Sequence, residues 1–273
     1  MAKAISRRTV LKGLGIAVGT AAIGTSRPQP TDARGVPRTA ERCFIYLRHA
    51  ASNLETGAAE EPKGQWVISA LLVLDPRLPR QLLRRTKRHQ LAATELKTPE
   101  IRARKVPDDF REYLYKLLAA RKGRGLEAYS LRVSHELLQS KGDQVGLFQL
   151  RIIQALLKAC DLWRFQEVFV YQSLPSLQGL SEKAFRDGLQ SGPWIPRETR
   201  LRVWEHDPAW DQRVLPVGYP RILPNDALQV TDFLTHAFFQ KYQYGNRRLV
   251  NLIGPIVRRE IDARGLQRTE LLR

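Results

Sequence analysis

The chain has 273 residues, 43% of them hydrophobic and 26% charged, a balance that excludes a disordered or fibrous protein. Its formal net charge is +18, and residues 1–33 contribute only +4 of this, so the body of the chain is itself basic. Such an excess attracts polyanions and makes nucleic acid or another polyanion the expected partner; a generally basic proteome is the alternative explanation. Cys43 and Cys160 are too few for a disulfide scaffold or a zinc site, and we expect buried free thiols.

Residues 1–33 have the pattern of an export signal. The segment SRRTVLK at 6–12 is followed by an uncharged stretch at 13–26, which is too short and too rich in Gly and Ala to span a bilayer. The paired arginines resemble a twin-arginine signal, with 31–33 as the nearest cleavage site; a fortuitously basic N-terminus is the alternative. The resemblance implies a protein that is periplasmic, extracellular or anchored by its leader, and without it the chain would be cytoplasmic.

Residues 34–41 read as a polar linker to a single α/β domain over 42–273. Short apolar runs predict buried strands at 43–47 and 65–74, the second stopped by Asp75-Pro76. The spacing of apolar residues predicts two helices in the next part of the chain, separated by a short extended piece. A Pro followed by two Asp residues marks the start of the second helix. The expected elements are a helix at 78–89, an extended piece at 94–97 and a helix at 107–120.

The second half alternates strands and helices. The expected order is a strand at 126–133, a helix at 145–159, strands at 167–171 and 201–204, and helices at 226–242 and 249–261, with a loop-rich insert at 191–225. Two strands followed by alternating elements predict a mixed sheet covered by helices. No segment of the body approaches eighteen apolar residues, so we expect no transmembrane segment there.

Three segments resemble, in the right order, the family known as domain of unknown function 3800, whose fold is ribonuclease H-like. The strongest match is the helix LQVTDFLTHA at 228–237, with the basic stretch and the glycine that follow it. The second is the run QWVISALLVLDP at 65–76, which is followed by a helix and then by Glu95-Leu96-Lys97. The third is the first strand, at 44–47. The resemblance covers residues 42–262 and implies an α/β fold with a ribonuclease H-like mixed sheet flanked by helices.

Such nucleases are similar in holding two divalent ions with clustered carboxylates. The resemblance leaves Glu95 and Asp232 as catalytic and magnesium-binding acids, but Arg48 replaces the acid that should follow the first strand, and none is present at 170–173. A guanidinium at about 4 Å from a divalent ion would repel it by about 8 kcal/mol at an effective dielectric near 20. We therefore expect a catalytically impaired nuclease-type domain of unknown substrate. Any retained activity would be that of a Mg²⁺-dependent phosphodiesterase or nuclease.

One hypothesis is that Arg48 occupies the vacated metal position and pairs with Glu95 and Asp232 as a structural ion pair. The alternative is that Arg48 is exposed at a strand end and the two acids lie apart. His236, one helical turn after Asp232, either flanks the same site or has a structural role.

A dense basic run supplies candidate contacts to a nucleic-acid backbone, and its alternative interpretation is a solvated helix face. The candidate nucleic-acid-binding residues are Arg84, Arg85, Lys87, Arg88 and Lys97.

Two other functions remain open. The segment YLRHA at 46–50 resembles the start of a histidine phosphatase, in which His49 would attack phosphorus, Arg48 would hold the phosphate and His206 would be the second histidine. The other alternative is a non-enzymatic exported domain that binds its partner through a basic face.

Overall fold

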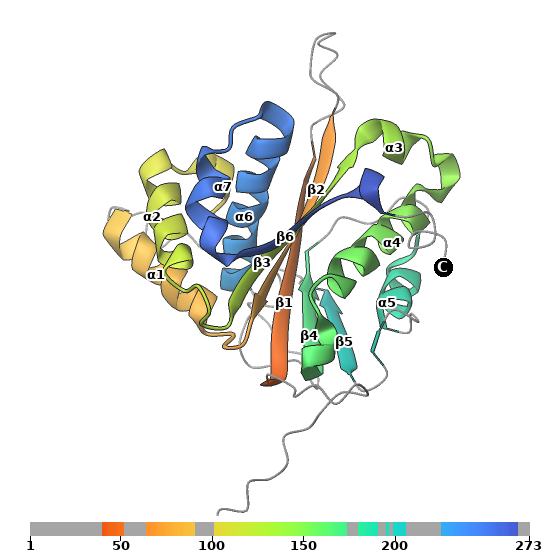
Figure 1. The fold of residues 1–273 in the computed structure, drawn as a ribbon, viewed down its shortest axis with the longest axis horizontal. Coiled ribbons are helices and arrows are strands. Elements are labelled where there is room, and N and C mark those ends of the chain that lie inside the picture. Colours follow the sequence, from red (N-terminus) through yellow and green to blue (C-terminus); the bar gives the residue numbers. More distant parts are fainter. Residues whose placement is uncertain are drawn as a thin grey trace, which may run out of the picture.

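The computed structural model describes residues 40–51, 64–90, 101–173, 180–190, 195–196, 199–205 and 225–266. These residues form one six-stranded mixed sheet with helices on both faces (Figure 1). The predicted α/β class, a mixed sheet flanked by helices, is confirmed.

The sheet has the strand order β5-β4-β1-β2-β3-β6. Strands β1, β2 and β3 form an antiparallel meander, β4 runs parallel to β1, β5 parallel to β4, and β6 parallel to β3. The central strands read as almost continuous apolar runs because helices bury both of their faces. The bounds are β1 Ala40–Ala51, β2 Gln65–Val73, β3 Leu126–Ser134, β4 Phe165–Gln172, β5 Arg200–Glu205 and β6 Val257–Asp262.

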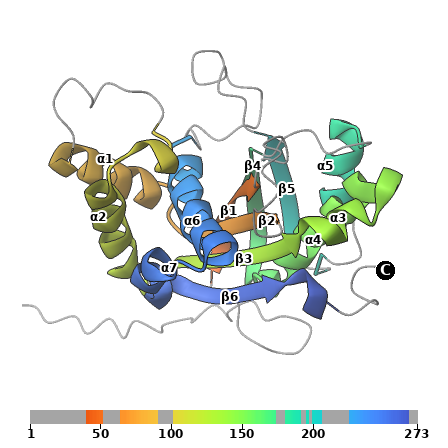
Figure 2. The same ribbon diagram turned by 90° about the horizontal axis from the view of Figure 1, so that it is seen from above.

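Two groups of helices cover the sheet, as the two views in Figures 1 and 2 show. One face carries α1 (Leu78–Gln90), α2 (Asp108–Ala119), α6 (Asn225–Tyr244) and α7 (Arg248–Ile253). The other carries α3 (His135–Gln139), α4 (Val145–Lys158) and α5 (Glu182–Gln190). Short 3-10 turns occupy Ala103–Lys105, Gly142–Gln144, Leu162–Arg164, Gly254–Ile256 and Ala263–Gly265. None of the helices in the described ranges is long and apolar enough to cross a membrane.

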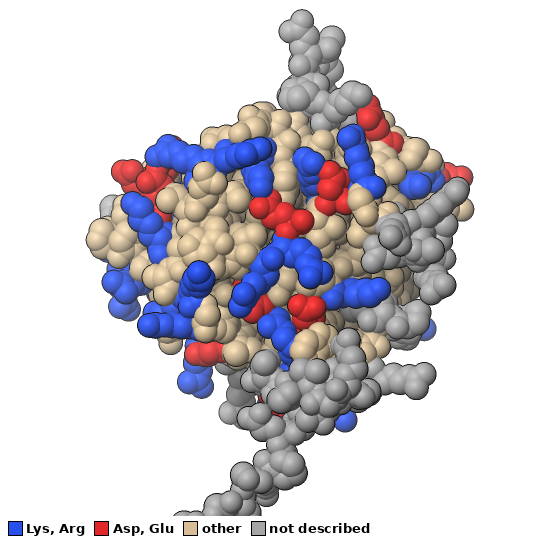
Figure 3. Space-filling view, in the orientation of Figure 1, with Lys and Arg blue, Asp and Glu red and all other residues tan. Residues whose placement is uncertain are grey.

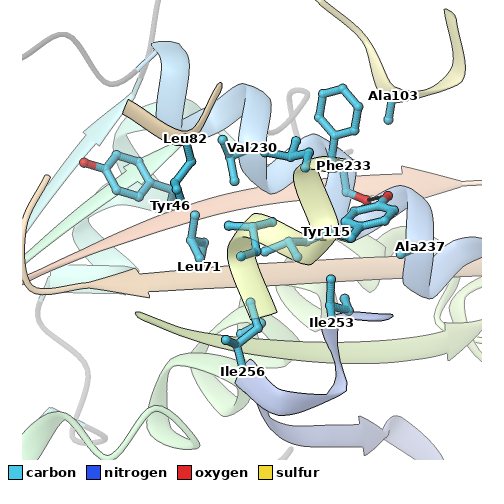
Figure 4. Packing of buried hydrophobic residues seen from close by; sticks show 14 of the residues in the cluster. Tyr46, Leu71, Leu82, Ala103, Tyr115, Val230, Phe233, Ala237, Ile253 and Ile256 are labelled. Carbon is cyan, nitrogen blue, oxygen red and sulfur yellow. Dashed lines mark hydrogen bonds between the residues drawn. The ribbon is translucent and has the colours of Figure 1, made fainter. Parts of the chain in front are cut away.

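Helix α6 is the central element of its face and packs across β1 and β2. Figure 4 shows Val230 and Phe233 of α6 within the cluster that also holds Tyr46 of β1. The buried hydroxyl of Tyr115 donates a hydrogen bond of 2.7 Å to the carbonyl of Phe233, so the one polar atom of this aromatic side chain is satisfied. This packing fixes the position of α6 relative to the end of β1.

The opposite core contains both cysteines as buried free thiols, as predicted. Beside them, the buried carboxylate of Glu127 on β3 accepts hydrogen bonds from Tyr129 (2.6 Å), Arg164 (2.8 Å) and Arg258 (3.2 Å). Burial raises the pKa of Glu127, but the bonds from Arg164 and Tyr129 outweigh it and hold that pKa below its usual value. Glu127 thus ties β3 to β6 and to the turn before β4.

Most predicted elements are present, and one is wrong. The helix expected at 249–261 ends at Ile253, because Pro255 lacks the N–H that a continuing helix needs, and residues 257–262 instead form β6 on the open edge of β3. The strand expected at 43–47 is longer, 40–51, and helices α3 and α5 were not predicted. The leader at 1–33, residues 34–39 of the linker predicted at 34–41, the extended piece at 94–97 and most of the insert at 191–225 lie outside the described residues. Residues 40–41 of the predicted linker belong to β1 instead, because they extend its pairing with β4.

The Glu127 network predicts a measurable contribution to stability. Glu127→Gln keeps the side-chain shape but removes the charge that Arg164 and Arg258 share, and we expect it to lower the free energy of unfolding by about 2–3 kcal/mol. Urea denaturation at pH 7 measures this loss. The exposed Asp143→Asn is the matched control and should stay within about 0.5 kcal/mol of the wild type. Equal effects of the two variants would show that the network is energetically neutral.

Candidate functional site

A cavity of about 490 Å³ lies at the end of the sheet where β1 ends, between the strand tip, the segment at 102–104 and helix α6. We call it the strand-end cavity. Its volume is in the range typical of ligand sites. It is lined by Arg48, His49, Ala50, Ala51, Arg102, Ala103, Arg104, Asp232, His236, Phe239, Gln240 and Tyr244.

Alternation along β1 decides which side chains face α6. Tyr46 packs in the core beneath α6, whereas Ile45 and Leu47 pack in the core beneath α4. Since successive strand side chains point to opposite faces, Arg48 extends toward α6 and His49 toward the other face.

Arg48 is held by the end of the neighbouring strand. Its Nη1 donates a hydrogen bond of 2.9 Å to Ser173 Oγ, and the Ser173 N–H donates to the carbonyl of Leu47 at 3.3 Å. Ser173 directly follows β4, which runs parallel to β1, so the two chain segments end side by side. The family resemblance leads one to expect acids at the ends of β1 and β4. These strand ends instead carry the guanidinium of Arg48 and the hydroxyl of Ser173, which are hydrogen-bonded to each other.

Asp232 lies on α6 and binds the backbone of the opposite wall. Its Oδ2 accepts a hydrogen bond of 3.0 Å from the Ala103 N–H, and one turn earlier Gln229 Oε1 accepts from the Ile101 N–H at 2.9 Å. These two bonds fix the segment along α6 and place the exposed Arg102 and Arg104 at the cavity.

The structure brings Arg48 and Asp232 to one cavity but does not pair them. Arg48 bonds to Ser173 and Asp232 to the Ala103 amide, and among the described contacts no ion pair joins the two side chains. The described contacts therefore do not include the Asp232 half of the predicted ion pair, since each of the two side chains bonds to a different partner. Glu95, the third member of that hypothesis, and Lys97 lie outside the described residues.

Both histidines that line the cavity are held in the neutral form. Burial lowers the pKa of His49 to about 4, with Arg48 acting in the same direction and Asp232 against it. Burial also lowers the pKa of His236, helped by Arg111 and opposed by Asp232 and Asp108. Neither imidazole adds positive charge to the cavity at neutral pH.

The described side chains do not fit a divalent cation. Magnesium requires hard oxygen ligands, and here one carboxylate, already bonded by an amide, faces the guanidinium-bearing Arg48, Arg102 and Arg104. Within the described ranges, no three His, Cys, Asp or Glu side chains are grouped closely enough to hold a metal ion. The charge balance favours an anion instead.

The basic run of the sequence lies elsewhere, on α1. Arg84, Arg85 and Arg88 are exposed, and Lys87 is half-buried, with a pKa lowered by burial and by Arg84 against the opposing effect of Asp226. None of these four lines the strand-end cavity. On the face seen in Figure 3, basic side chains are spread out with acidic ones between them rather than gathered into one block.

The geometry disfavours a histidine phosphatase. That chemistry needs arginine and histidine side chains at one phosphate. Both Arg48 and His49 line the strand-end cavity, but β1 continues to Ala51, so strand alternation turns their side chains toward opposite faces of the sheet. The second histidine of that hypothesis, His206, lies outside the described residues.

Comparisons with known proteins identify no family. A solved structure described as the PCNA:RNase HII complex from Archaeoglobus fulgidus matches at 12% identity with a TM-score of 0.41, covering 76% of this chain and 79% of that chain. No family model matches, and no curated protein matches. The strand order β3-β2-β1-β4-β5, with an antiparallel meander followed by parallel strands, is that of the ribonuclease H-like fold, so the predicted fold class is confirmed.

Sequence reasoning missed several residues that line the cavity, namely Arg102, Arg104, Phe239, Gln240 and Tyr244, and it identified 170–173, which includes Ser173, only as a strand end without the expected acid. The only local signal was the basic run Arg102-Ala103-Arg104-Lys105 ahead of Pro107. Tyr244 carries no signal until the fold places it at the cavity.

The lowered pKa of His49 predicts how stability depends on pH. Between pH 6.5 and about 4 the unfolded chain binds a proton that the folded chain refuses, so the free energy of unfolding falls as the pH falls through this window. The contribution of His49 is at most about 3 kcal/mol. His49→Gln should lose less stability than the wild type between pH 7.5 and 4.5, measured by urea denaturation. The difference between the stability losses of the wild type and the variant gives the contribution of His49 apart from that of the other histidines. Identical losses in the two proteins would contradict the burial of His49 as a neutral group.

Proposed function

We propose that this chain is a ribonuclease H-like domain whose strand-end cavity binds the phosphate groups of a polyanion without holding the metal pair of a nuclease. One observation carries the proposal: three guanidinium-bearing residues, Arg48, Arg102 and Arg104, line a cavity in which the single described carboxylate, Asp232, is already bonded to a backbone amide. A site with this charge balance attracts phosphate and repels Mg²⁺.

Arginine suits this task because its planar fork binds two phosphate oxygens at once. Arg104 is exposed and makes no ion pair or side-chain hydrogen bond with the described residues, so it is available to a ligand. The formal charge of +18 raises the local concentration of polyanions around the molecule. Nucleic acid is the polyanion that this combination favours.

Three parts of the proposal rest on the sequence alone. They are membership of the family known as domain of unknown function 3800, export by the twin-arginine signal at 1–33, and backbone contacts from the basic run on α1 and from Lys97.

Binding should depend on salt and on Arg104. Arg104→Met removes one phosphate contact, and we expect it to weaken the affinity for fluorescein-labelled oligo(dT) about tenfold and to reduce the slope of log K against log salt by about 1. Fluorescence anisotropy at several NaCl concentrations measures both, with inorganic polyphosphate as competitor. The control is Arg124→Met, an exposed arginine in the turn before β3 at the other end of the sheet. Equal losses in the two variants would mean that binding is not located in this cavity.

Substitutions that restore carboxylates at the two strand ends should create a site that binds Mg²⁺. Arg48→Asp/Ser173→Asp places two carboxylates at the strand ends beside Asp232, and we expect saturating Mg²⁺ to raise the Tm of this double variant by about 3 °C at ten times Kd. The wild-type Tm should not respond. Adding Asp232→Asn to the double variant is the control and should abolish the gain. An Asp232-dependent response of the wild type would contradict the proposal, and no response of the double variant would show that the three positions do not converge.

A further inference from the structure

Helix α6 presents a continuous stripe of side chains to the strand-end cavity. Asp232, His236, Phe239, Gln240 and Tyr244 all line it, at spacings that place them on one face of the helix over three turns. From Asp232 to Tyr244 the helix rises about 18 Å at 1.5 Å per residue. This stripe is longer than a single phosphate group needs.

The two ends of the stripe differ in chemistry. Around Asp232 the wall carries Arg48, Arg102 and Arg104, whereas the far end of the stripe carries Phe239, about two turns later, and Tyr244, about three turns later. Tyr244 is 60% exposed, which makes it one of three large hydrophobic side chains that are exposed among the described residues. The cavity therefore has a cationic end and an aromatic end.

Tyr244, the last residue of helix α6, is held in place by contacts with its neighbours. Its ring meets the ring of Phe239 edge-on, with centroids 6.0 Å apart. The preceding residue, Gln243, is buried and accepts a hydrogen bond of 3.0 Å from the Gln65 N–H at the start of β2. A fixed ring with an exposed face is a surface on which a planar group can stack.

We propose that Tyr244 is a base-stacking residue and that the strand-end cavity takes a single-stranded nucleic acid, with its phosphates at the arginine end and a base on the Tyr244 ring. This inference rests on the proposed function, since it names the polyanion and adds a second kind of contact. Cationic grooves interrupted by aromatic side chains bind single strands in this way. A duplex offers Tyr244 nothing to contact, because each base in it is already stacked between its neighbours.

Three probes of equal length, about 15 nucleotides, separate stacking from phosphate binding. They are oligo(dT), oligo(rU) and an abasic phosphodiester strand that keeps the charges and lacks the bases; fluorescence anisotropy gives Kd for the full chain with each. Tyr244→Ala should weaken the binding of at least one base-bearing strand roughly five- to hundredfold, the loss of one stacked base. It should leave the affinity for the abasic strand unchanged. Tyr244→Phe, which keeps the ring, should behave as the wild type does.

The outcomes distinguish this inference from the proposed function. If Tyr244→Ala binds oligo(dT) and oligo(rU) as tightly as the wild type while Arg104→Met weakens both, the stacking role is overturned and phosphate binding stands. If Tyr244→Ala weakens the abasic strand as much as the others, Tyr244 supports the cavity structurally and the stacking role is again overturned. If the wild type binds none of the three strands at low salt, the proposed function fails, and this inference fails with it.

Discussion

The hydrogen bond from the Ala103 amide to the Asp232 carboxylate decides what the strand-end cavity can bind. It uses the one described carboxylate of the cavity as a scaffold, and with the bond from Ile101 to Gln229 it fixes the segment that carries Arg102 and Arg104 against α6. A carboxylate that is charged and bonded to a backbone amide stabilises the fold at this point. The same bond brings two arginines to the cavity, so the local packing and the positive charge of the site have a common origin.

The end of β1 is the second half of this arrangement. Parallel pairing of β1 with β4 brings Arg48 beside Ser173. Because Tyr46 packs beneath α6 and residues two apart on a strand lie on the same face, Arg48 also points toward α6. In a metal-dependent nuclease of this fold, acids at these strand ends would approach each other at the price of repulsion that divalent ions relieve. Here a guanidinium and a hydroxyl meet without such repulsion and share a hydrogen bond.

Much of the fold was predictable from the sequence because its elements are locally consistent. The apolar run of β2 and the helical spacings of α1, α4 and α6 each indicate their structure without help from the rest of the chain. The error at 257–262 has a tertiary cause: these residues form a strand only because the edge of β3 is available to pair with them. A sequence read segment by segment does not contain that information.

The site was less predictable than the fold. Arg48 and Asp232 were found through a family resemblance, and the structure brings them to one cavity, but their partners, Ser173 and the Ala103 amide, follow from pairing and packing. The spacing of Asp232 and His236 on one helix face was visible in the sequence, but Tyr244 lies beyond the helix predicted at 226–242, and nothing in the sequence shows that it would be exposed. The sequence pattern of a helix face is the same whether that face packs in the core or lines a cavity that is open to a ligand.

Anomalous diffraction from crystals of the wild-type protein soaked in Mn²⁺ tests the central claim most directly. The account predicts no manganese peak at Asp232, with Arg48 still within hydrogen-bond distance of Ser173 and the Ala103 amide still on the carboxylate. A manganese ion bound by Asp232 between α6 and the tip of β1 would contradict it, because the cavity would then be a metal centre rather than an anion site.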